Sequence, residues 1–295
     1  MNKFIAFILA SYFALALNGC AHTATVTSTS NPLDNISRQI EADSKNPDLY
    51  VKRGTLQYEA RNYIKAIEDY TKALAIKDTD QTIYLLRGKA FFDNGNYVLA
   101  NEDLKKAIAL NDKCGECYFY AGKAYAERNQ NKLAFESLTK AIEFKINTLE
   151  CYDLRGKVAI KLGLIQNAID DYSQILKADP SRKDILYRRA VAYYALAKNE
   201  DSLADLDQLI KSGDKFEYFY YRGLVNHNSK KYQQAIADFS HALEINPKSA
   251  QAYFSRAETY QDMNQNDKSI SDLKKSCELG NLIVCDELKK LDSKK

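Results

Sequence analysis

The stretch LYVKRGTLQYEARNYIKAIEDYTKALAIKD at residues 49–78 returns in altered form as YFYYRGLVNHNSKKYQQAIADFSHALEINP at residues 218–247. Both stretches carry an aromatic residue, an Arg-Gly pair and a second apolar block at matching positions. A pattern that recurs in this way indicates an array of repeats. The chain has 295 residues, which exceeds the usual size of a single core and fits such an array.

Seven copies of the pattern follow one another along the chain, and positions are counted here from the first residue of each copy. A small residue marks position 8: Gly54, Gly88, Gly122, Gly156, Ala190, Gly223 and Ala257. Apolar residues fall three and four apart in two blocks, which predicts two amphipathic helices, A and B. One such hairpin cannot bury its own apolar stripe, so the copies must stack. The copies span residues 47–80, 81–114, 115–148, 149–182, 183–215, 216–249 and 250–280.

The residues at positions 4, 8, 20 and 24 resemble the pattern of the tetratricopeptide repeat (TPR) family. In the first copy these are Tyr50, Gly54, Ala66 and Tyr70. The resemblance implies an all-α fold, an α/α superhelical solenoid of seven helix hairpins with a C-terminal capping helix. Residues 34–46 are expected to form a leading helix, and residues 281–295 the capping helix and a basic tail.

Charged residues recur inside the helices at two positions of the repeat. Position 7 is arginine and position 23 is aspartate in six copies, which gives the pairs Arg53–Asp69, Arg87–Asp103, Arg155–Asp171, Arg189–Asp205, Arg222–Asp238 and Arg256–Asp272. The third copy has Ala121 and Ser137 instead. This joint loss predicts a partly buried ion pair from helix A to helix B, because removing one partner alone would leave a poorly solvated charge. The alternative, a ladder of arginines for an anionic ligand, does not predict it.

Positions 2, 5, 9 and 12 share the face of helix A opposite the packing positions. By resemblance to TPR proteins, this face is expected to lie on the concave side of the superhelix and to bind extended or helical peptides. Apolar and aromatic residues on it predict a groove for a partner chain, and packing against adjacent A helices is the alternative. The predicted groove residues are Leu85, Lys89, Phe92, Phe119, Lys123, Lys157, Tyr187, Tyr194, Tyr220 and Phe254.

The three lysines in this set occupy position 9 of consecutive copies. They would form a short cationic ladder, which favours an acidic partner segment. Acidic residues at position 2 could neutralise the ladder: Glu116, Glu150 and Asp184.

Two cysteines near the C-terminus are candidates for a disulfide. Cys277 and Cys285 are separated by Gly280 and Asn281, which break the helix between them. A bridge that fastens the closing helix to the seventh copy is therefore feasible in an oxidising compartment. The spacing also resembles that of cysteine-rich α/α repeat relatives of TPR proteins.

Three further cysteines, Cys114, Cys117 and Cys151, leave several arrangements open. The CGEC stretch could be a redox pair or a local structural bridge, or Cys117 could pair with Cys151 and leave one odd thiol. Without a nearby histidine they make a poor zinc site, so no metal is predicted.

The first residues, MNKFIAFILASYFALALNGC, have Lys3 ahead of an apolar run and are shaped like a signal peptide over residues 1–19. LNGC at residues 17–20 resembles the lipobox of bacterial lipoproteins, which implies that Cys20 is lipidated and anchors the chain to a membrane. An ordinary secreted protein without lipid is the alternative. Residues 20–33 are expected to form the lipidated start and a flexible tether. Ala21 after the cysteine favours the outer membrane, by the same resemblance.

Composition argues against catalysis and against nucleic acid. The chain has three histidines and a net charge of +3, and it shows no nucleophile elbow, HExxH motif or phosphate-binding glycine loop. We therefore expect no enzyme activity and no cofactor. The expected function is that of a lipid-anchored adaptor on the periplasmic side of the bacterial outer membrane, binding envelope proteins through a peptide segment. A receptor for a small envelope ligand is the alternative, and the oligomeric state is not predicted.

Overall fold

The computed structural model describes residues 31–292, and these residues form α-helices without a strand. The helices are α1 (Pro32–Ala42), α2 (Pro47–Glu59), α3 (Tyr63–Ile76), α4 (Gln81–Asp93), α5 (Tyr97–Leu110), α6 (Gly115–Glu127), α7 (Asn131–Glu143), α8 (Leu149–Lys161), α9 (Ile165–Ala178), α10 (Lys183–Ala195), α11 (Asn199–Ile210), α12 (Phe216–Asn228), α13 (Tyr232–Ile245), α14 (Ala250–Asp262), α15 (Asn266–Glu278) and α16 (Leu282–Asp292). From α2 to α15 they form seven hairpins, in which the even-numbered helices are A and the odd-numbered ones B.

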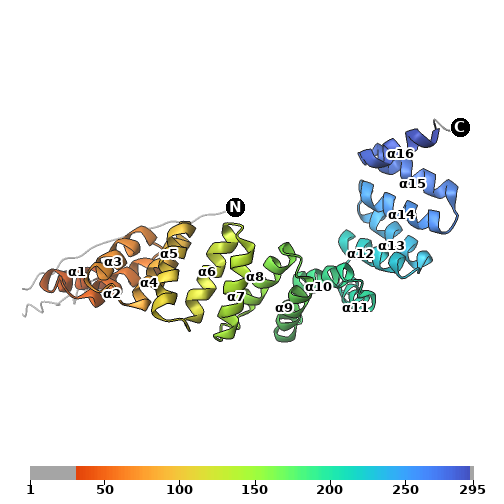
Figure 1. Ribbon diagram of the computed structural model, residues 1–295. Coiled ribbons are helices and arrows are strands. Elements are labelled where there is room, and N and C mark those ends of the chain that lie inside the picture. Colours follow the sequence, from red (N-terminus) through yellow and green to blue (C-terminus); the bar gives the residue numbers. More distant parts are fainter. Residues whose placement is uncertain (1–30, 293–295) are drawn as a thin grey trace, which may run out of the picture.

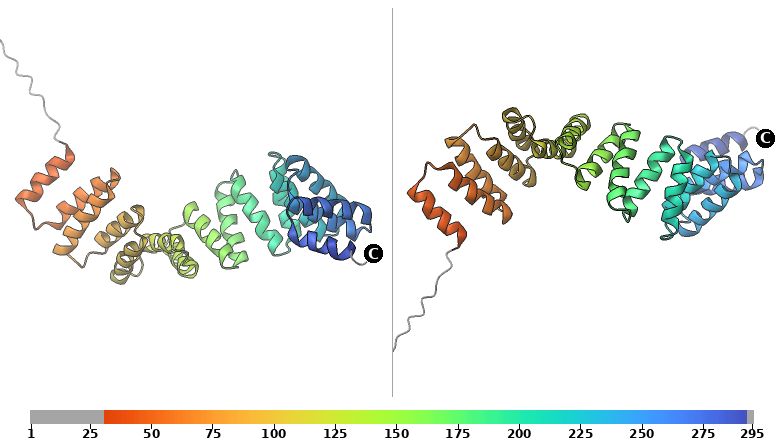
Figure 2. Two further views of the ribbon diagram at one scale, coloured as in Figure 1. Left: turned by 90° about the horizontal axis from the view of Figure 1, so that it is seen from above. Right: turned by 90° about the horizontal axis from the view of Figure 1, so that it is seen from below.

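The hairpins stack in series to form an elongated array (Figure 1). Each helix packs against the helices before and after it in the chain. Views from above and below show the same open series, with the N-terminal and C-terminal helices at opposite ends (Figure 2). The predicted all-α solenoid of seven hairpins is confirmed.

The leading helix differs from its predicted bounds of 34–46. It begins at Pro32, because the side chain of Asn31 accepts a hydrogen bond from the Leu33 amide and caps the helix there. It ends at Ala42, since Asn46 in turn caps α2 by accepting from the Asp48 amide. The short segment between the two helices therefore belongs to neither.

The small residue at position 8 lets helix A approach the bulky residue at position 24 of helix B. A Cβ at Gly156 would lie 2.7 Å from the Tyr172 ring, and one at Gly223 would lie 2.6 Å from the Phe239 ring. Both rings are fully buried. Glycine at position 8 is thus a packing requirement of these hairpins.

A residue in the left-handed backbone conformation ends each A helix at position 15. Its φ is positive in every hairpin, at Arg61, Gly95, Asn129, Gly163, Ala197, Lys230 and Asn264. Left-handed residues commonly end helices in this way, and glycine adopts the conformation with the least strain. The turn geometry is therefore constant although its residue varies.

Each of the six predicted arginine–aspartate pairs is joined within its hairpin. In the fourth hairpin, Nε and Nη2 of Arg155 donate to the two carboxylate oxygens of Asp171 at 3.0 and 2.6 Å. The carboxylate of Asp171 is almost wholly buried, with 1% of the residue exposed. The six shortest contacts all lie between 2.6 and 2.8 Å, in Arg53–Asp69, Arg87–Asp103, Arg155–Asp171, Arg189–Asp205, Arg222–Asp238 and Arg256–Asp272.

Every one of these arginines also reaches back to the preceding B helix through Nη1, a contact that the sequence analysis missed. Arg155, for example, donates to the Thr139 hydroxyl at 3.3 Å. The acceptors lie at position 25 of the preceding hairpin, or at the equivalent place in α1: Ser37, Thr71, Thr139, Ser173, Asp207 and Ser240. Lys105 occupies position 25 ahead of the third hairpin, the one without an arginine. The arginine thus joins consecutive hairpins as well as the two helices of its own.

The closing helix is covalently fixed. Cys277 in α15 and Cys285 in α16 form a disulfide, with their Cα atoms 4.9 Å apart. Leu279 ends α15 and Gly280 takes a positive φ of 99°, which folds α16 back against α15. The break in the helix is what brings the two sulfur atoms together.

Candidate protein-binding groove

The A helices lie side by side along one face of the array. Neighbouring A helices contact each other from α2 through to α8, and again from α10 through to α14. Helices α8 and α10 come less close to each other than the other neighbouring A helices do. The A-helix face is therefore closed by packing along most of its length and opens between α8 and α10.

A groove of about 780 Å³ occupies this opening. Helices α6, α8, α9 and α10 provide its walls, which are mostly apolar. Its lining residues are Ala126, Glu127, Asn129, Leu154, Lys157, Val158, Ile160, Lys161, Ile165, Tyr172, Tyr187, Arg188, Val191, Ala192 and Ala195. We call this space the α8–α10 groove.

Uncovered apolar side chains make the groove suited to a polypeptide. Ile160 at position 12 of α8 is 39% exposed, and Val191 on α10 lines the same groove. Tyr187 adds a half-buried ring, and burial, with further contributions from Tyr221 and Glu217, raises the pKa of its phenol. The phenol is therefore neutral at physiological pH and can accept or donate a hydrogen bond there.

An ion-pair network spans the groove. Asp153 on α8 accepts from Lys157 of its own helix at 2.6 Å and from Arg188 on α10 at 2.7 Å. Lys157 remains 45% exposed, and Lys161 one turn further on is also exposed. Asp153 is already satisfied by two cations. Lys157 and Lys161 outnumber the one carboxylate of the lining, Glu127, so the net charge at this rim is positive.

Two of the three lysines of the predicted cationic ladder are paired with carboxylates. Lys89 on α4 binds Glu116 on α6 at 2.7 Å, and Lys123 on α6 binds Glu150 on α8 at 2.8 Å. Burial acts to lower the pKa of Lys89, but the hydrogen bond to Glu116 and the proximity of Tyr120 outweigh it and raise the pKa. These two lysines tie adjacent A helices together, and each is neutralised by its partner.

Asp184, the third proposed neutralising residue, binds Arg182 instead of a groove lysine. Of the three ladder lysines, Lys157 is therefore the one that belongs to the α8–α10 groove.

Three of the predicted groove residues are buried and cannot line an open surface, which corrects the prediction. Leu85, Phe119 and Tyr220 are 7–8% exposed. They occupy position 5, where neighbouring A helices approach closely enough to cover the side chain. For these residues the alternative of packing between A helices is the right one.

The other predicted rings are half buried. Phe92 packs edge-on against Tyr120, with the Lys123 ammonium 5.0 Å from the Phe92 ring centre, and Tyr194 packs edge-on against Tyr221. Phe254 is also half buried. These rings contribute contacts along the A-helix face, outside the α8–α10 groove.

The sequence analysis missed the part of the groove that comes from position 6. Leu154 and Arg188 stand there and line the groove, as Val191 does at position 9. The signal was present, because position 6 also carries aromatic residues at Tyr120 and Tyr221.

Of the arrangements left open for the three cysteines near α6 and α8, the structure has the local bridge. Cys114 and Cys117 form a disulfide at the start of α6, and Gln81 lies 3.2 and 3.3 Å from their two sulfur atoms. Cys151 is free and fully buried, so the bond from Cys117 to Cys151 is excluded. Burial raises the pKa of the Cys151 thiol to about 12, which leaves it protonated and unreactive.

Within residues 31–292, no cluster of His, Cys, Asp and Glu side chains is arranged to hold a metal ion. Each helix of the described part is too short or too polar to cross a bilayer. Cys20 and the signal-like segment lie outside the described residues.

Models of known protein families match this chain within the residues that form the helix hairpins. Family models described as tetratricopeptide repeat match residues 85–146, 154–196, 184–212, 216–249 and 239–271. Among curated proteins, sperm-associated antigen 1 from Homo sapiens is 28% identical over 105 residues. That match covers 35% of this chain and 11% of the human protein.

Solved structures share the fold at low sequence identity. YrrB, described as a TPR protein with an unusual peptide-binding site, is 22% identical with a TM-score of 0.56, over 63% of this chain and 96% of YrrB. The C-terminal part of a TPR protein from Cytophaga hutchinsonii is 18% identical with a TM-score of 0.59, over 80% and 98% of the two chains. MamA from Desulfovibrio magneticus RS-1 is 17% identical with a TM-score of 0.52, over 57% and 96%.

Proposed function

Because this chain belongs to the tetratricopeptide repeat family, a family of protein-interaction scaffolds, we propose that it is a lipid-anchored adaptor of the bacterial cell envelope. In this proposal the α8–α10 groove holds a peptide segment of a partner protein and so positions the partner at the membrane. The observation that carries the proposal is the groove itself, an apolar opening of about 780 Å³ in a face that is closed by packing elsewhere. A protein of similar fold, YrrB, is described as having a peptide-binding site.

The groove favours a partner segment with apolar side chains along one side and acidic residues beside them. Ile160 and Val191 offer apolar contact area, and Lys157 and Lys161 offer positive charge at the rim. An extended or helical segment of this kind would bury its apolar side chains and approach the lysines with its carboxylates.

The proposed location rests on the N-terminal sequence and on the cysteines. Residues 1–20 have the pattern of a lipoprotein signal, in which Cys20 would carry the lipid. Two disulfides, Cys114–Cys117 and Cys277–Cys285, are typical of proteins in an oxidising compartment such as the periplasm. Placement at the outer membrane, facing the periplasm, is part of the same proposal.

Photo-crosslinking in cells tests the groove. We expect a crosslinker at Val191 to capture a discrete partner, and a crosslinker at the exposed residue Gln208 on α11 to capture none. Adding Ile160→Asp to the Val191 variant should abolish capture without changing the thermal unfolding of the chain. Equal capture from Val191 and Gln208, or capture that survives Ile160→Asp, would contradict a partner in this groove.

Lipidation is tested separately. A palmitate analogue should label the wild-type chain, and Cys20→Ala should lose both the label and membrane association. Membrane association of an unlabelled chain would refute the lipid anchor and leave the groove proposal standing.

A further inference from the structure

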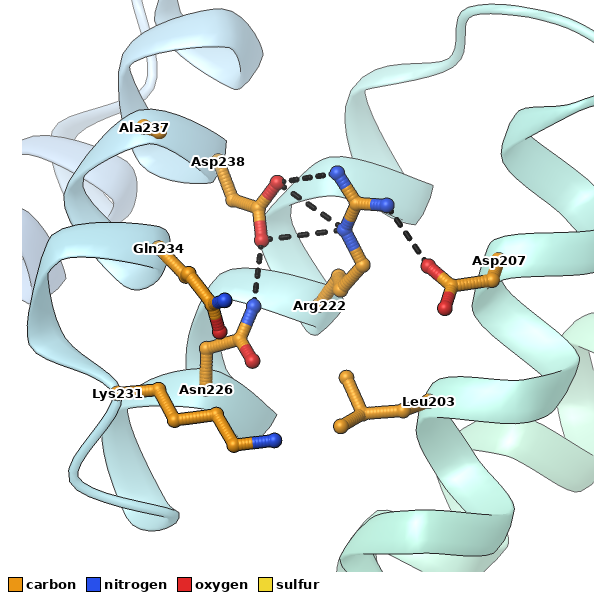
Figure 3. A pocket seen from close by; sticks show the side chains of 8 residues that line it. All are labelled: Leu203, Asp207, Arg222, Asn226, Lys231, Gln234, Ala237 and Asp238. Carbon is orange, nitrogen blue, oxygen red and sulfur yellow. Dashed lines mark hydrogen bonds and ion pairs between the residues drawn. The ribbon is translucent and has the colours of Figure 1, made fainter.

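A second hollow, unlike the groove in chemistry, lies between α11, α12 and α13 (Figure 3). Its volume is about 400 Å³, near the lower end of the ligand-pocket range of about 300–1,000 Å³. Most of the residues that line it have polar side chains, namely Asp207, Arg222, Asn226, Lys231, Gln234 and Asp238, and Leu203 forms an apolar wall. The hollow belongs to the sixth hairpin and to the B helix before it.

The sixth hairpin has no aromatic ring at position 11, where four other hairpins carry one. The corresponding rings of Tyr193 and Tyr260 lie 5.6 and 5.9 Å from the guanidinium carbons of Arg189 and Arg256. The third and second hairpins also carry rings there, Tyr125 and Phe91.

In the fourth hairpin position 11 is Ala159, and Phe135 from the preceding B helix lies 5.8 Å from the guanidinium carbon of Arg155. The sixth hairpin has Asn226 at position 11 and Leu203 on the preceding B helix. Neither is aromatic, so no ring from these two positions fills the hollow beside Arg222.

A carboxylate replaces the usual hydroxyl at one edge of this space. Arg222 binds Asp238 within its hairpin and reaches back to Oδ1 of Asp207 at 2.7 Å, where the other five arginines meet a serine or threonine. The Asp207 side chain is still 53% exposed. It can therefore accept a further hydrogen bond from a donor in the hollow.

A cation without a partner stands at another edge. The Lys231 side chain points toward the hollow and has no hydrogen bond or ion pair to any of residues 31–292 (Figure 3). Lys198, at the same position of the fifth hairpin, donates to Gln166 at 2.7 Å. Asn226 is 5% exposed, and its Nδ2 donates a hydrogen bond to the Asp238 carboxylate at 2.8 Å. The side-chain oxygen Oδ1 of Asn226 therefore remains as an acceptor.

The formal charges of the hollow balance, but Arg222 is shared by two aspartates whereas Lys231 stands apart from them. Arg222 and Lys231 are positive, and Asp207 and Asp238 are negative. A simple anion would meet two carboxylates there and a simple cation would meet two positive groups, so neither is favoured. A small molecule with both charges matches both edges.

We propose that this hollow binds a free α-amino acid in its zwitterionic form. Lys231 binds the carboxylate of the ligand, and Asp207 binds its ammonium. The apolar wall at Leu203 receives the side chain. This site lies apart from the α8–α10 groove. It gives the chain a binding site for a small molecule in addition to the groove for its proposed partner.

Calorimetric titration of the purified full chain tests the proposal. The probes are the common L-amino acids, with acetate and methylammonium as the separate charges. We expect saturable binding of at least one amino acid, and binding at least tenfold weaker for acetate and for methylammonium. No saturation with any amino acid, or acetate binding as tightly as the best amino acid, would overturn the proposal.

Two variants and a matched control place the ligand. Asn226→Tyr fills the hollow with the residue that stands at this position in three other hairpins, so the fold should tolerate it while amino-acid binding falls at least tenfold. Lys231→Met, at an exposed residue, should also weaken binding at least tenfold, and Lys198→Met should leave it unchanged. Unaltered binding in Lys231→Met would overturn the assignment even if Asn226→Tyr failed to fold.

Discussion

The third and fourth hairpins share one backbone geometry but are held closed by different chemistry. In the fourth, Arg155 joins Asp171 of its own B helix to Thr139 of the preceding one. In the third, the corresponding residues are Ala121, Ser137 and Lys105, so all three groups are changed together. The buried pair is therefore an interdependent unit that is kept or lost as a whole.

The third hairpin has apolar packing and a disulfide in place of an ion pair. Phe119 and Leu138 pack in one buried cluster with Cys151 from the next hairpin, and the Cys114–Cys117 disulfide lies at the start of α6. Replacing a buried ion pair by well-packed apolar groups is often neutral for stability, whereas removing one partner of a pair is costly. The comparison teaches that the hairpin needs a closed interface, and that either chemistry can supply it.

The largest effect is expected from breaking the pair in the fourth hairpin. Arg155→Ala leaves the Asp171 carboxylate buried without its cation, and should cost about 3–5 kcal/mol of unfolding free energy. Urea denaturation combined with hydrogen exchange of α8 and α9 measures the loss. The control is Arg182→Ala, which breaks an exposed ion pair to Asp184 and should cost at most about 1 kcal/mol. Similar losses in both variants would mean that burial does not set the value of the pair.

An intermediate effect is expected from the disulfide of the third hairpin. Cys114→Ser with Cys117→Ser removes a bridge that closes a very short loop, and should cost about 2 kcal/mol by the loop-entropy relation. Hydrogen exchange of α6 should rise, while that of α8 should stay unchanged. A change confined to α8 would contradict the local role of the bridge.

A smaller effect is expected at the turn residue. Gly163→Ala places a side chain at a φ of 74° in the fourth hairpin and should cost about 1–2 kcal/mol. Asn129 already has a side chain at the same position of the third hairpin, so Asn129→Ala should cost only a few tenths of this value. Thermal unfolding of both variants gives the comparison, and equal costs would show that the left-handed backbone is not the cause.

The smallest effect concerns Cys151 at the junction of the two hairpins. Its folded pKa is about 12, above the ordinary value of 9.0, so the stability gained from the neutral thiol is complete below pH 9 and is lost as the pH rises toward 12. At pH 8 iodoacetamide should leave Cys151 unlabelled in the native chain. Arg155→Ala should speed its labelling, because the cost of opening α8 is reduced. Rapid labelling of the native chain would contradict its burial.

Much of this fold could be predicted because the repeat fixes both helix spacing and packing partners. Positions 8 and 24 have the same separation in every copy, so the contact between Gly156 and Tyr172 follows from the pattern. The joint loss of charge in the third hairpin likewise identified Arg155 and Asp171 as partners. The back-reaching bond to Thr139 was not predicted, because it joins different copies and position 25 varies between serine, threonine, aspartate and lysine.

The groove was predicted less well than the fold. A helical face can be predicted from position numbers alone, but its exposure depends on the distance between neighbouring A helices. That distance is short at Phe119 and Tyr220, which are buried, and longer at Tyr187. The separation between α8 and α10 is a property of the stacked array and has no signal within a single copy.

The backward reach of the arginines gives the array a direction. Each hairpin that carries the arginine depends on the element before it for one hydrogen bond, and α1 serves the first hairpin through Ser37. Removing the element before such a hairpin would therefore leave Nη1 of its arginine without this partner, and removing the element after it would not. Within the described residues, the seventh hairpin is held to the following helix α16 by the covalent link between Cys277 and Cys285.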